Sequence, residues 1–316
     1  MKKVFKIVLK VVLALLALIV ALVLLVFGGL NLAKFVLYDD YYAMKSDLCK
    51  NPGLSDGFVC QGICALEAED KILVSGYMKD DSASRIYVTD LEDHSFYVNL
   101  SKEGKDFTGH AGGVAVHGDT IYVASGKAVH LLPVDTVLNA QNGDTVEFTE
   151  SIPVNNSASF IYADEQYLYV GEFHDGGSYV TDHPYETPEG LHHAIVSCYE
   201  YDDLTAPTKI YSLRDKVQGI CFTPDGSVVL STSYGLADSV YYLYHLDDAI
   251  ESGLTLDGAP VYYLDQCQKE INGPAMAEGL DYYDGKVITL TESASDKYIY
   301  GKFFFANQIV ALDFSK

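Results

Sequence analysis

The 316-residue sequence predicts an all-β domain, a five-bladed β-propeller, behind one N-terminal transmembrane helix. Three observations carry this prediction. An apolar run occupies residues 11–30, a strand-rich unit recurs five times after residue 57 at a spacing of about fifty residues, and no long helical pattern interrupts the units. Such a repeat, with four short strands in each unit, is typical of propeller blades. A six-bladed ring with one hidden unit and an irregular β-sandwich are the alternatives.

The apolar run has the length of a membrane-spanning helix, since about 20 residues cross the hydrocarbon core. Four lysines precede the run, and the first acidic residues, Asp39 and Asp40, follow it. Because positive charge marks the cytoplasmic side, we expect a single-pass signal anchor in the cell membrane, with a cytoplasmic N-terminus and an extracytoplasmic C-terminal domain. A cleaved signal peptide is the alternative, but the run exceeds the usual apolar core and only a weak cleavage signal follows it.

These features divide the chain into three expected parts. Residues 1–33 form a cytoplasmic stub and the transmembrane helix, residues 34–56 form a tether, and residues 57–316 form the propeller. Five of the 21 lysines and arginines lie in the first 34 residues, which hold no acid, so the remainder carries 16 basic and 44 acidic residues, a net charge of −28. Phosphate binding needs a basic surface, so nucleic-acid binding is excluded.

Each repeat begins with a small-residue step and a short apolar strand. The chain turns at an Asp/Gly-type corner into a second strand, and after a variable loop a third apolar strand ends in Asp. The openings are Gln61-Gly62-Ile63, His110-Ala111-Gly112-Gly113-Val114, Ser157-Ala158-Ser159-Phe160, Gln218-Gly219-Ile220 and Glu278-Gly279-Leu280. The second strands cover residues 72–74, 121–123, 168–170, 228–230 and 287–289, and the third strands cover residues 86–90, 129–135, 195–202, 240–247 and 309–313.

The fourth, outer strands are expected at residues 96–100, 146–148, 209–211 and 261–263. The fifth unit has no candidate after its third strand. An unpaired sheet edge favours aggregation, so we expect a segment between Phe35 and Cys60 to supply the missing strand. Within this segment, Phe35-Val36-Leu37-Tyr38 has the composition of a strand.

The residues that open the inner strands converge on one mouth of the channel, and hairpin pairing brings further residues beside them. Pairing about Asp284-Gly285 places Glu278 beside Glu292, with about 5 Å between Cβ atoms. Two such carboxylates suit general acid/base chemistry, because one can keep its proton while the other ionises. The expected mouth comprises Gln61, Ser75, Tyr77, His110, Ser159, Glu172, Gln218, Ser233, Tyr234, Glu278 and Glu292.

Three of these residues are candidates for catalysis: Glu278, Glu292 and His110. Imidazole exchanges a proton near neutral pH and can also ligate a metal. The candidates for ligand binding are Gln61, Tyr77, Ser159, Glu172, Gln218, Ser233 and Tyr234. The alternative is a structural role, because a wet channel attracts polar side chains and a glutamate at a strand start can accept backbone N–H groups from the next blade.

A long insertion in the third unit, residues 172–193, is rich in Gly, Pro and His. Long loops in compact domains often carry function, so we expect this one to cover the mouth. Its histidines are ligands that a transition metal accepts, but their spacing specifies no ligand set and no cofactor. They are His174, His183, His192 and His193.

All six cysteines follow the apolar run, so the expected topology permits disulfides. Cys49 and Cys60 form the pair that we expect to be bridged. Cys64 and Cys221 follow equivalent Gln-Gly-Ile steps, and such small residues suit a buried inner strand.

Over residues 57–316 the unit pattern resembles bacterial extracytoplasmic propellers of the gluconolactonase-like and YncE-like group. The first unit, with Phe58-Val59-Cys60-Gln61-Gly62-Ile63 followed by Ser75-Gly76-Tyr77 and Ser84-Arg85, is also similar to the opening blade of plant-type glutaminyl cyclases, which are five-bladed. That family has a catalytic Glu in a Gly-Glu-Gly-Leu step of its second blade, where this chain has His110-Ala111-Gly112-Gly113. Glu278-Gly279-Leu280 repeats the step only in the last unit. The resemblance therefore implies the fold and not cyclase activity.

Two functions remain in view. The first is a membrane-anchored propeller that binds a small molecule, glycan or peptide at a polar channel mouth, as a receptor or as a hydrolase. The second is a noncatalytic interaction or scaffold module at the cell surface, which the acidic, tyrosine-rich composition and the lack of a known catalytic motif favour. The clustered carboxylates make the first the preferred expectation.

Overall fold

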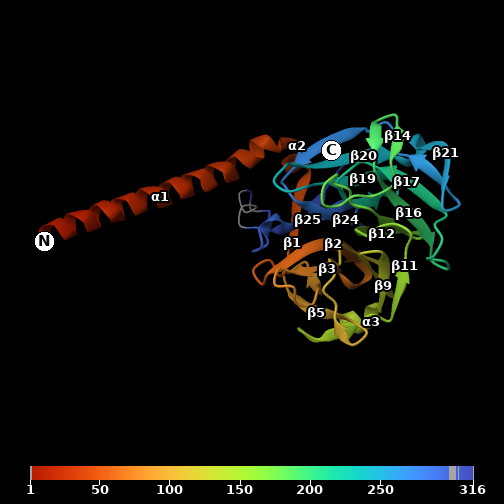
Figure 1. The fold of residues 1–316 in the computed structure, drawn as a ribbon, viewed down its shortest axis with the longest axis horizontal. Helices are drawn as coiled ribbons and strands as arrows, with labels where there is room; N and C mark the ends of the chain where they lie inside the picture. Colours follow the sequence, from red (N-terminus) through yellow and green to blue (C-terminus); the bar gives the residue numbers. More distant parts are fainter. Residues whose placement is uncertain (1, 299–303, 305, 316) are drawn as a thin grey trace.

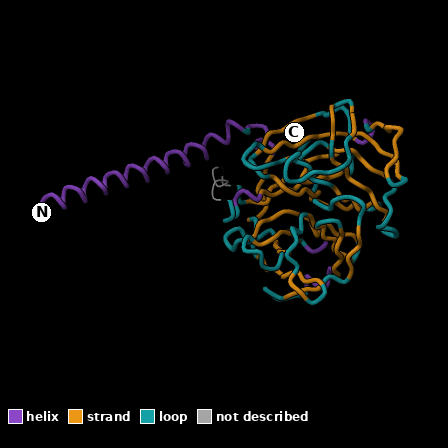
Figure 2. The backbone as a smooth tube through the Cα atoms, in the orientation of Figure 1, coloured by secondary structure: helices purple, strands orange, loops and turns teal. Residues whose placement is uncertain are grey.

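The computed structural model describes residues 2–298, 304 and 306–315. Five sheets surround a central axis as the blades of a five-bladed propeller, and one long helix, α1 (Lys2–Leu37), leaves the ring sideways (Figure 1). Apart from this helix the described chain consists almost entirely of strands and loops (Figure 2). The ring confirms the expected fold class. Helix α1 has 36 residues and is about 54 Å long at 1.5 Å per residue, which exceeds the roughly 30 Å thickness of a bilayer core.

Each blade is a meander of antiparallel strands whose first strand lies nearest the axis. Blade one contains β2 (Phe58–Leu66), β3 (Lys71–Met78), β4 (Arg85–Asp90) and β5 (Ser95–Lys102). Blade two contains β7 (Gly113–His117), β8 (Thr120–Ser125), β9 (Ala128–Pro133) and β11 (Glu150–Pro153). Blade three contains β12 (Phe160–Ala163), β13 (Tyr167–Gly171), β16 (Ala194–Glu200) and β17 (Lys209–Leu213). Blade four contains β18 (Val217–Phe222), β19 (Ser227–Thr232), β20 (Ser239–His245) and β23 (Lys269–Gly273), and blade five contains β24 (Ala277–Tyr283), β25 (Lys286–Thr291), β26 (Gln308–Leu312) and β1 (Lys45–Lys50).

The outer strand of blade five comes from the chain that precedes blade one. β1 pairs antiparallel with β26, from Lys45 opposite Leu312 to Lys50 opposite Gln308. This strand lies inside the segment expected to close the ring. The expected tetrapeptide at residues 35–38 is instead helix and turn, because its apolar residues continue α1.

The segment between α1 and β1 packs into the propeller. It includes the short helix α2 (Asp39–Met44) and buries Tyr38, Tyr41 and Met44. The Tyr38 hydroxyl donates to Asp238 Oδ1 at 2.7 Å, and the Tyr41 ring stacks on Tyr241 at 5.9 Å between centroids. The apolar helix therefore joins the core of the propeller without a loose spacer, while the boundaries of the three parts remain a prediction.

Two of the four expected outer strands belong to the neighbouring blade. β10 (Thr145–Glu147), expected in blade two, pairs parallel with β5 of blade one, and β22 (Ala259–Tyr263), expected in blade four, pairs parallel with β17 of blade three. β21 (Ile250–Leu256) pairs with β22, and β6 (Lys105–Asp106) pairs with β5. In blades two and four, the chain that follows the third strand first pairs with the outer strand of the preceding blade. It then returns and forms the outer strand of the blade it left. This arrangement protects two exposed edges.

The small-residue step of the repeat lets the inner strands meet backbone to backbone around the axis. A Cβ atom added to Gly62 would lie 2.6 Å from the Cα of Gly113, and one added to Gly279 would lie 3.1 Å from the Cα of Gly62. The same holds for Gly219, whose added Cβ would lie 3.0 Å from the Cα of Gly279. Such approaches leave no room for a side chain, so the glycines are a packing requirement at this level of the channel.

All six cysteines are free in the part of the chain that the structure describes, so the expected Cys49–Cys60 bridge is wrong. Both thiols lie in one apolar cluster between blades one and five, where the Cys60 thiol donates to the carbonyl of Thr291 at 3.4 Å. Cys64 and Cys221 are buried inner-strand residues, as expected.

Candidate functional site

The openings of three inner strands carry β-bulges. In β2, β18 and β24 the pairing register shifts at Gln61, Gln218 and Glu278. A bulge leaves a residue out of the ladder and redirects its side chain. The backbone just before two of these residues is also unusual, since Lys216 and Met276 both have φ of 66°. Strained backbone of this kind gathers at functional sites, which marks this end of the channel.

Two carboxyl groups of blade five lie at this mouth with one amide from each neighbouring blade. Glu278 is 2% exposed, and Gln218 Nε2 from blade four lies 3.5 Å from its Oε1. Gln61 Nε2 from blade one donates to Glu292 Oε2 at 3.0 Å. Glu292 follows β25 directly, and its backbone N–H donates to the carbonyl of Met276 at 3.0 Å. Pairing within blade five and the flanking glutamines thus hold the two carboxyl groups together.

Burial changes the proton affinity of both groups. It raises the pKa of Glu278 well above its ordinary value, and the charge of Glu292 raises it further. Burial also raises the pKa of Glu292 to about 7, against the opposing effects of Lys297 and the hydrogen bond from Gln61. Both carboxyl groups therefore hold their protons more tightly than ordinary glutamates, and a pair of this kind suits general acid/base chemistry.

A rim of aromatic and basic side chains lies beside the carboxyl pair. The hydroxyls of Tyr77 and Tyr298 lie 3.2 Å apart, and the Lys297 ammonium lies 4.4 Å from the centroid of the Tyr77 ring. His110 packs its ring against Tyr77 at 4.6 Å. Desolvation, followed by the charge of Lys297, lowers the pKa of His110. The structure thus brings Glu278 and Glu292 together and places His110 on the rim. Lys297 and Tyr298 come from the loop after β25, so the repeat pattern gave no signal for them.

Hydroxyl groups on or directly after second strands link neighbouring blades at this end. Ser75 Oγ donates to the carbonyl of Ala111 and Ser233 Oγ to that of Ala277, each at 2.8 Å. Ser233 also lies 3.5 Å from Gln218 Nε2. Ser159 is half-buried and its N–H donates to the carbonyl of Gly171 at 2.8 Å. The hydroxyls of Ser75 and Ser233 thus bond to backbone carbonyls of the next blade, whereas the contact of Ser159 involves its backbone alone.

Two further predicted residues, Glu172 of blade three and Tyr234 of blade four, lie next to the insertion of blade three. Glu172 is buried, accepts from the N–H of Ser157 at 3.1 Å, and faces His183 Nδ1 at 2.8 Å. The hydrogen bond that His183 donates to Glu172 raises the pKa of the imidazole. Tyr234 is 46% exposed and its ring lies 6.0 Å from that of Phe173. Glu172 thus pairs with a histidine of the insertion in blade three, and Tyr234 lies beside Phe173 of the same insertion.

The insertion reaches blade four through a small hairpin of β14 (Tyr185–Thr187) and β15 (Gly190–His192). Between these strands, the Glu189 carboxylate pairs with Arg214 and accepts from the Tyr244 hydroxyl at 2.8 Å and from the N–H of Cys267 at 3.1 Å. The hairpin of the insertion therefore contacts blade four, through Tyr244 and the backbone of Cys267.

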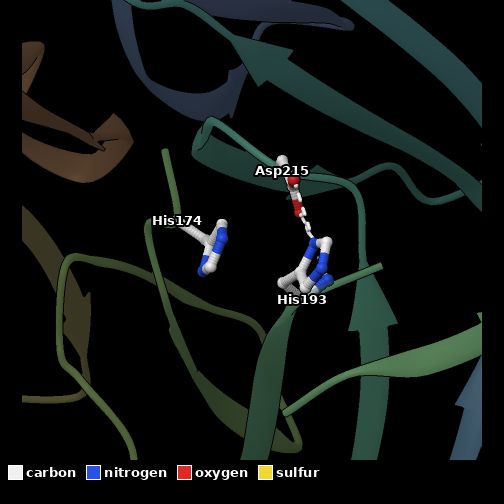
Figure 3. A group of neighbouring side chains, drawn as sticks. All are labelled: His174, His193 and Asp215. Atoms are coloured by element: carbon white, nitrogen blue, oxygen red, sulfur yellow. Dashed lines mark hydrogen bonds and ion pairs between the residues drawn. The ribbon is translucent and has the colours of Figure 1, made fainter. Parts of the chain in front are cut away.

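One cluster in this region has metal-binding residue types. The ligand atoms of His174, His193 and Asp215 all lie within 4.8 Å of one another (Figure 3). The two imidazole rings, however, stack at 4.6 Å with an angle of 11° between their planes. A metal ion lies in the plane of each imidazole that binds it, so two parallel stacked rings cannot share one ion unless a ring turns. His193 Nδ1 instead faces both oxygens of Asp215, at 3.0 and 3.1 Å.

The carboxyl pair is expected to contribute a component of the unfolding free energy that falls as the pH rises from about 4.5 to about 7, opposite in sign to the component from His130, whose pKa burial lowers to about 4. In this window the folded carboxyl pair keeps protons that glutamates of ordinary pKa release in the unfolded chain. The slope approaches about 1.4 kcal/mol per pH unit for each such group. Urea titrations at about pH 5 and about pH 7.5 check this. Asp281, whose buried pKa is about 7, adds a component of the same sign. Glu278→Gln should reduce the slope, and an unchanged slope would contradict the assignment.

No family model and no curated protein sequence matches the chain. Among solved structures, it is similar to the PQQ-bound aldose sugar dehydrogenase of Streptomyces coelicolor, with 14% identity and a TM-score of 0.43 over 78% of this chain and 76% of that one. BamB of Moraxella catarrhalis gives 9% identity and a TM-score of 0.34 over 81% and 83% of the two chains. Hydrazine synthase of Kuenenia stuttgartiensis gives 11% identity and a TM-score of 0.39 over 74% of this chain, which covers only 56% of that one. Likenesses this distant concern the fold alone, and they do not distinguish the gluconolactonase-like and YncE-like group from other propellers.

Proposed function

We propose that the protein is a membrane-anchored, extracytoplasmic propeller that binds a polar ligand at the channel mouth through Glu278 and Glu292. The buried carboxyl pair carries this proposal. Glu278 is 2% exposed and its hydrogen-bond contact with Gln218 is long, at 3.5 Å. A buried acid with so little compensation costs stability. A ligand that donates hydrogen bonds to the pair offsets that cost.

The same pair supports a hydrolytic role in the proposal. Glu278 holds a proton that it can donate to a leaving group, and Glu292 can accept one from water at neutral pH. Tyr77, Tyr298 and His110 then position the ligand from the rim. Gln61 and Gln218 orient the carboxyl groups. A small molecule, a glycan or a peptide end fits these requirements.

Melting experiments on the full chain in detergent test the site. A panel of sugars, lactones and peptides should contain a ligand that raises the wild-type midpoint, since a ligand at a hundred times its Kd stabilises by about 2.7 kcal/mol. Glu278→Gln should abolish that rise with folding nearly intact, because the amide keeps the shape of the carboxyl but not its proton affinity.

Glu270→Gln is the matched control, because Glu270 is exposed on β23 and the change removes one charge away from the mouth. It should respond to the ligand like the wild type. If no compound shifts the wild-type midpoint and Glu278→Gln loses roughly 1–3 kcal/mol of stability, the carboxyl is structural and the scaffold function is favoured.

The membrane part of the proposal rests on α1. The helix is long and apolar enough to span a bilayer, its described side chains are mostly exposed, and lysines lie at its start. Protease added to intact cells or spheroplasts should digest the propeller and spare the N-terminal stub. A propeller protected from protease would overturn the proposed orientation.

A further inference from the structure

A hollow lies at the opposite end of the channel from the carboxyl pair. Its volume is about 840 Å³, which falls in the range of small-molecule sites. All five inner strands contribute to its lining, with Ile63, Val114, Ile161, Phe222 and Leu280 among the residues. Between this hollow and the mouth the inner strands meet at the glycines described above, so the two sites are separate.

One acidic side chain stands out in this lining. Asp281 follows Leu280 in β24, at the position that Cys64 and Cys221 occupy after Ile63 and Ile220 in blades one and four. Its Oδ2 accepts from the N–H of Ala65 at 2.6 Å. Burial raises its pKa to about 7, so placing a carboxyl here costs free energy that the apolar or thiol residues of the other blades avoid.

The rest of the lining favours a positive charge. Glu67, Asp164 and Glu165 lie around the hollow together with the imidazole of His117, and its described lining residues include neither lysine nor arginine. Tyr162, Phe222 and Tyr282 supply aromatic rings. Aromatic faces and a carboxylate together are the chemistry that recognises an ammonium group with a hydrocarbon part.

We propose that this hollow binds a small organic amine, whose ammonium group pairs with Asp281 and whose hydrocarbon part packs on the aromatic rings. The site is independent of the carboxyl pair at the mouth, and it needs no activity there. The anionic form of Asp281 binds the amine, so binding strengthens above about pH 7 and weakens below it.

Calorimetry on the full chain in detergent at about pH 8 tests the proposal, with phenethylamine as the probe and phenethyl alcohol as its neutral counterpart. The amine should bind and the alcohol should bind at least about tenfold more weakly. Asp281→Asn should weaken the amine by about tenfold or more, since the amide can still accept from Ala65 but carries no charge.

Asp284→Asn is the matched control, because Asp284 is exposed in the turn of the same hairpin with φ of 47°, a conformation that asparagine tolerates. It should bind the amine like the wild type, as should Glu278→Gln. Equal binding of amine and alcohol, an unaffected Asp281→Asn, or loss of binding in Glu278→Gln would each overturn the proposal. If Asp281→Asn does not fold, amine binding by the wild type at about pH 5.5 decides, since protonation of Asp281 should weaken it.

Discussion

A truncation that begins at Asn51, and therefore lacks β1, is expected to lose the cooperative unfolding of the propeller and to aggregate. Without β1, the edge of β26 is left unpaired from Gln308 to Leu312. An exposed edge of this length pairs with other chains. The truncation also removes the buried side chains of Tyr41 and Met44 from the core, each worth about 2 kcal/mol. Thermal melts and size-exclusion chromatography measure both effects.

The matched control begins at Leu37, so it loses most of α1 but keeps α2, Tyr38 and β1. It should elute as a monomer and melt in one transition. Equal stability of the two truncations would mean that the ring does not depend on β1.

The inner three strands of every blade could be predicted because local pattern determines them. Alternating apolar residues and Asp-Gly corners specify a hairpin wherever both strands are adjacent in sequence, as about Asp284-Gly285. The outer strands of blades two, four and five are separated from their partners by long segments of chain, so composition could not assign them. Val146 and Val261 look alike as strand residues in either blade, and only tertiary packing places them in the preceding sheet.

At the mouth, the repeat predicted that Gln61, Gln218, Glu278 and Glu292 lie together but not how their side chains are oriented. Gln218 and Glu278 lie at the starts of their strands as expected, whereas β2 begins at Phe58, before Gln61. The bulges at these three residues follow from packing around the axis. Counting residues from the hairpin turn assumes an uninterrupted ladder of strand pairs. It could place Glu278 near Glu292, but it could not specify which glutamine lies beside each carboxyl group. Lys297 joins the rim from an irregular loop, where no periodic signal exists.

Gly62→Ala is expected to lower the unfolding free energy by about 3 kcal/mol, at the upper end of the cost of overpacking. The new Cβ would lie 2.5 Å from the backbone nitrogen of Val114 and 2.6 Å from the Cα of Gly113. These are backbone atoms of β7, which pairs with β8 and packs against β2 and β12, so they have little freedom to retreat. Urea titration of the variant and the wild type measures the loss.

Gly177→Ala separates this steric effect from the general consequences of replacing a glycine. Gly177 has no positive φ, like Gly62, but its added Cβ would meet only the Asp175 carboxylate, at an ordinary contact distance of 3.7 Å. Its unfolding free energy should stay within about 0.5 kcal/mol of the wild type. If Gly62→Ala is equally mild, the inner strands have room to separate, and the glycine step of the repeat reflects something other than close packing at the axis. A large loss confined to Gly62→Ala would instead tie this step of the sequence to the narrowest level of the ring.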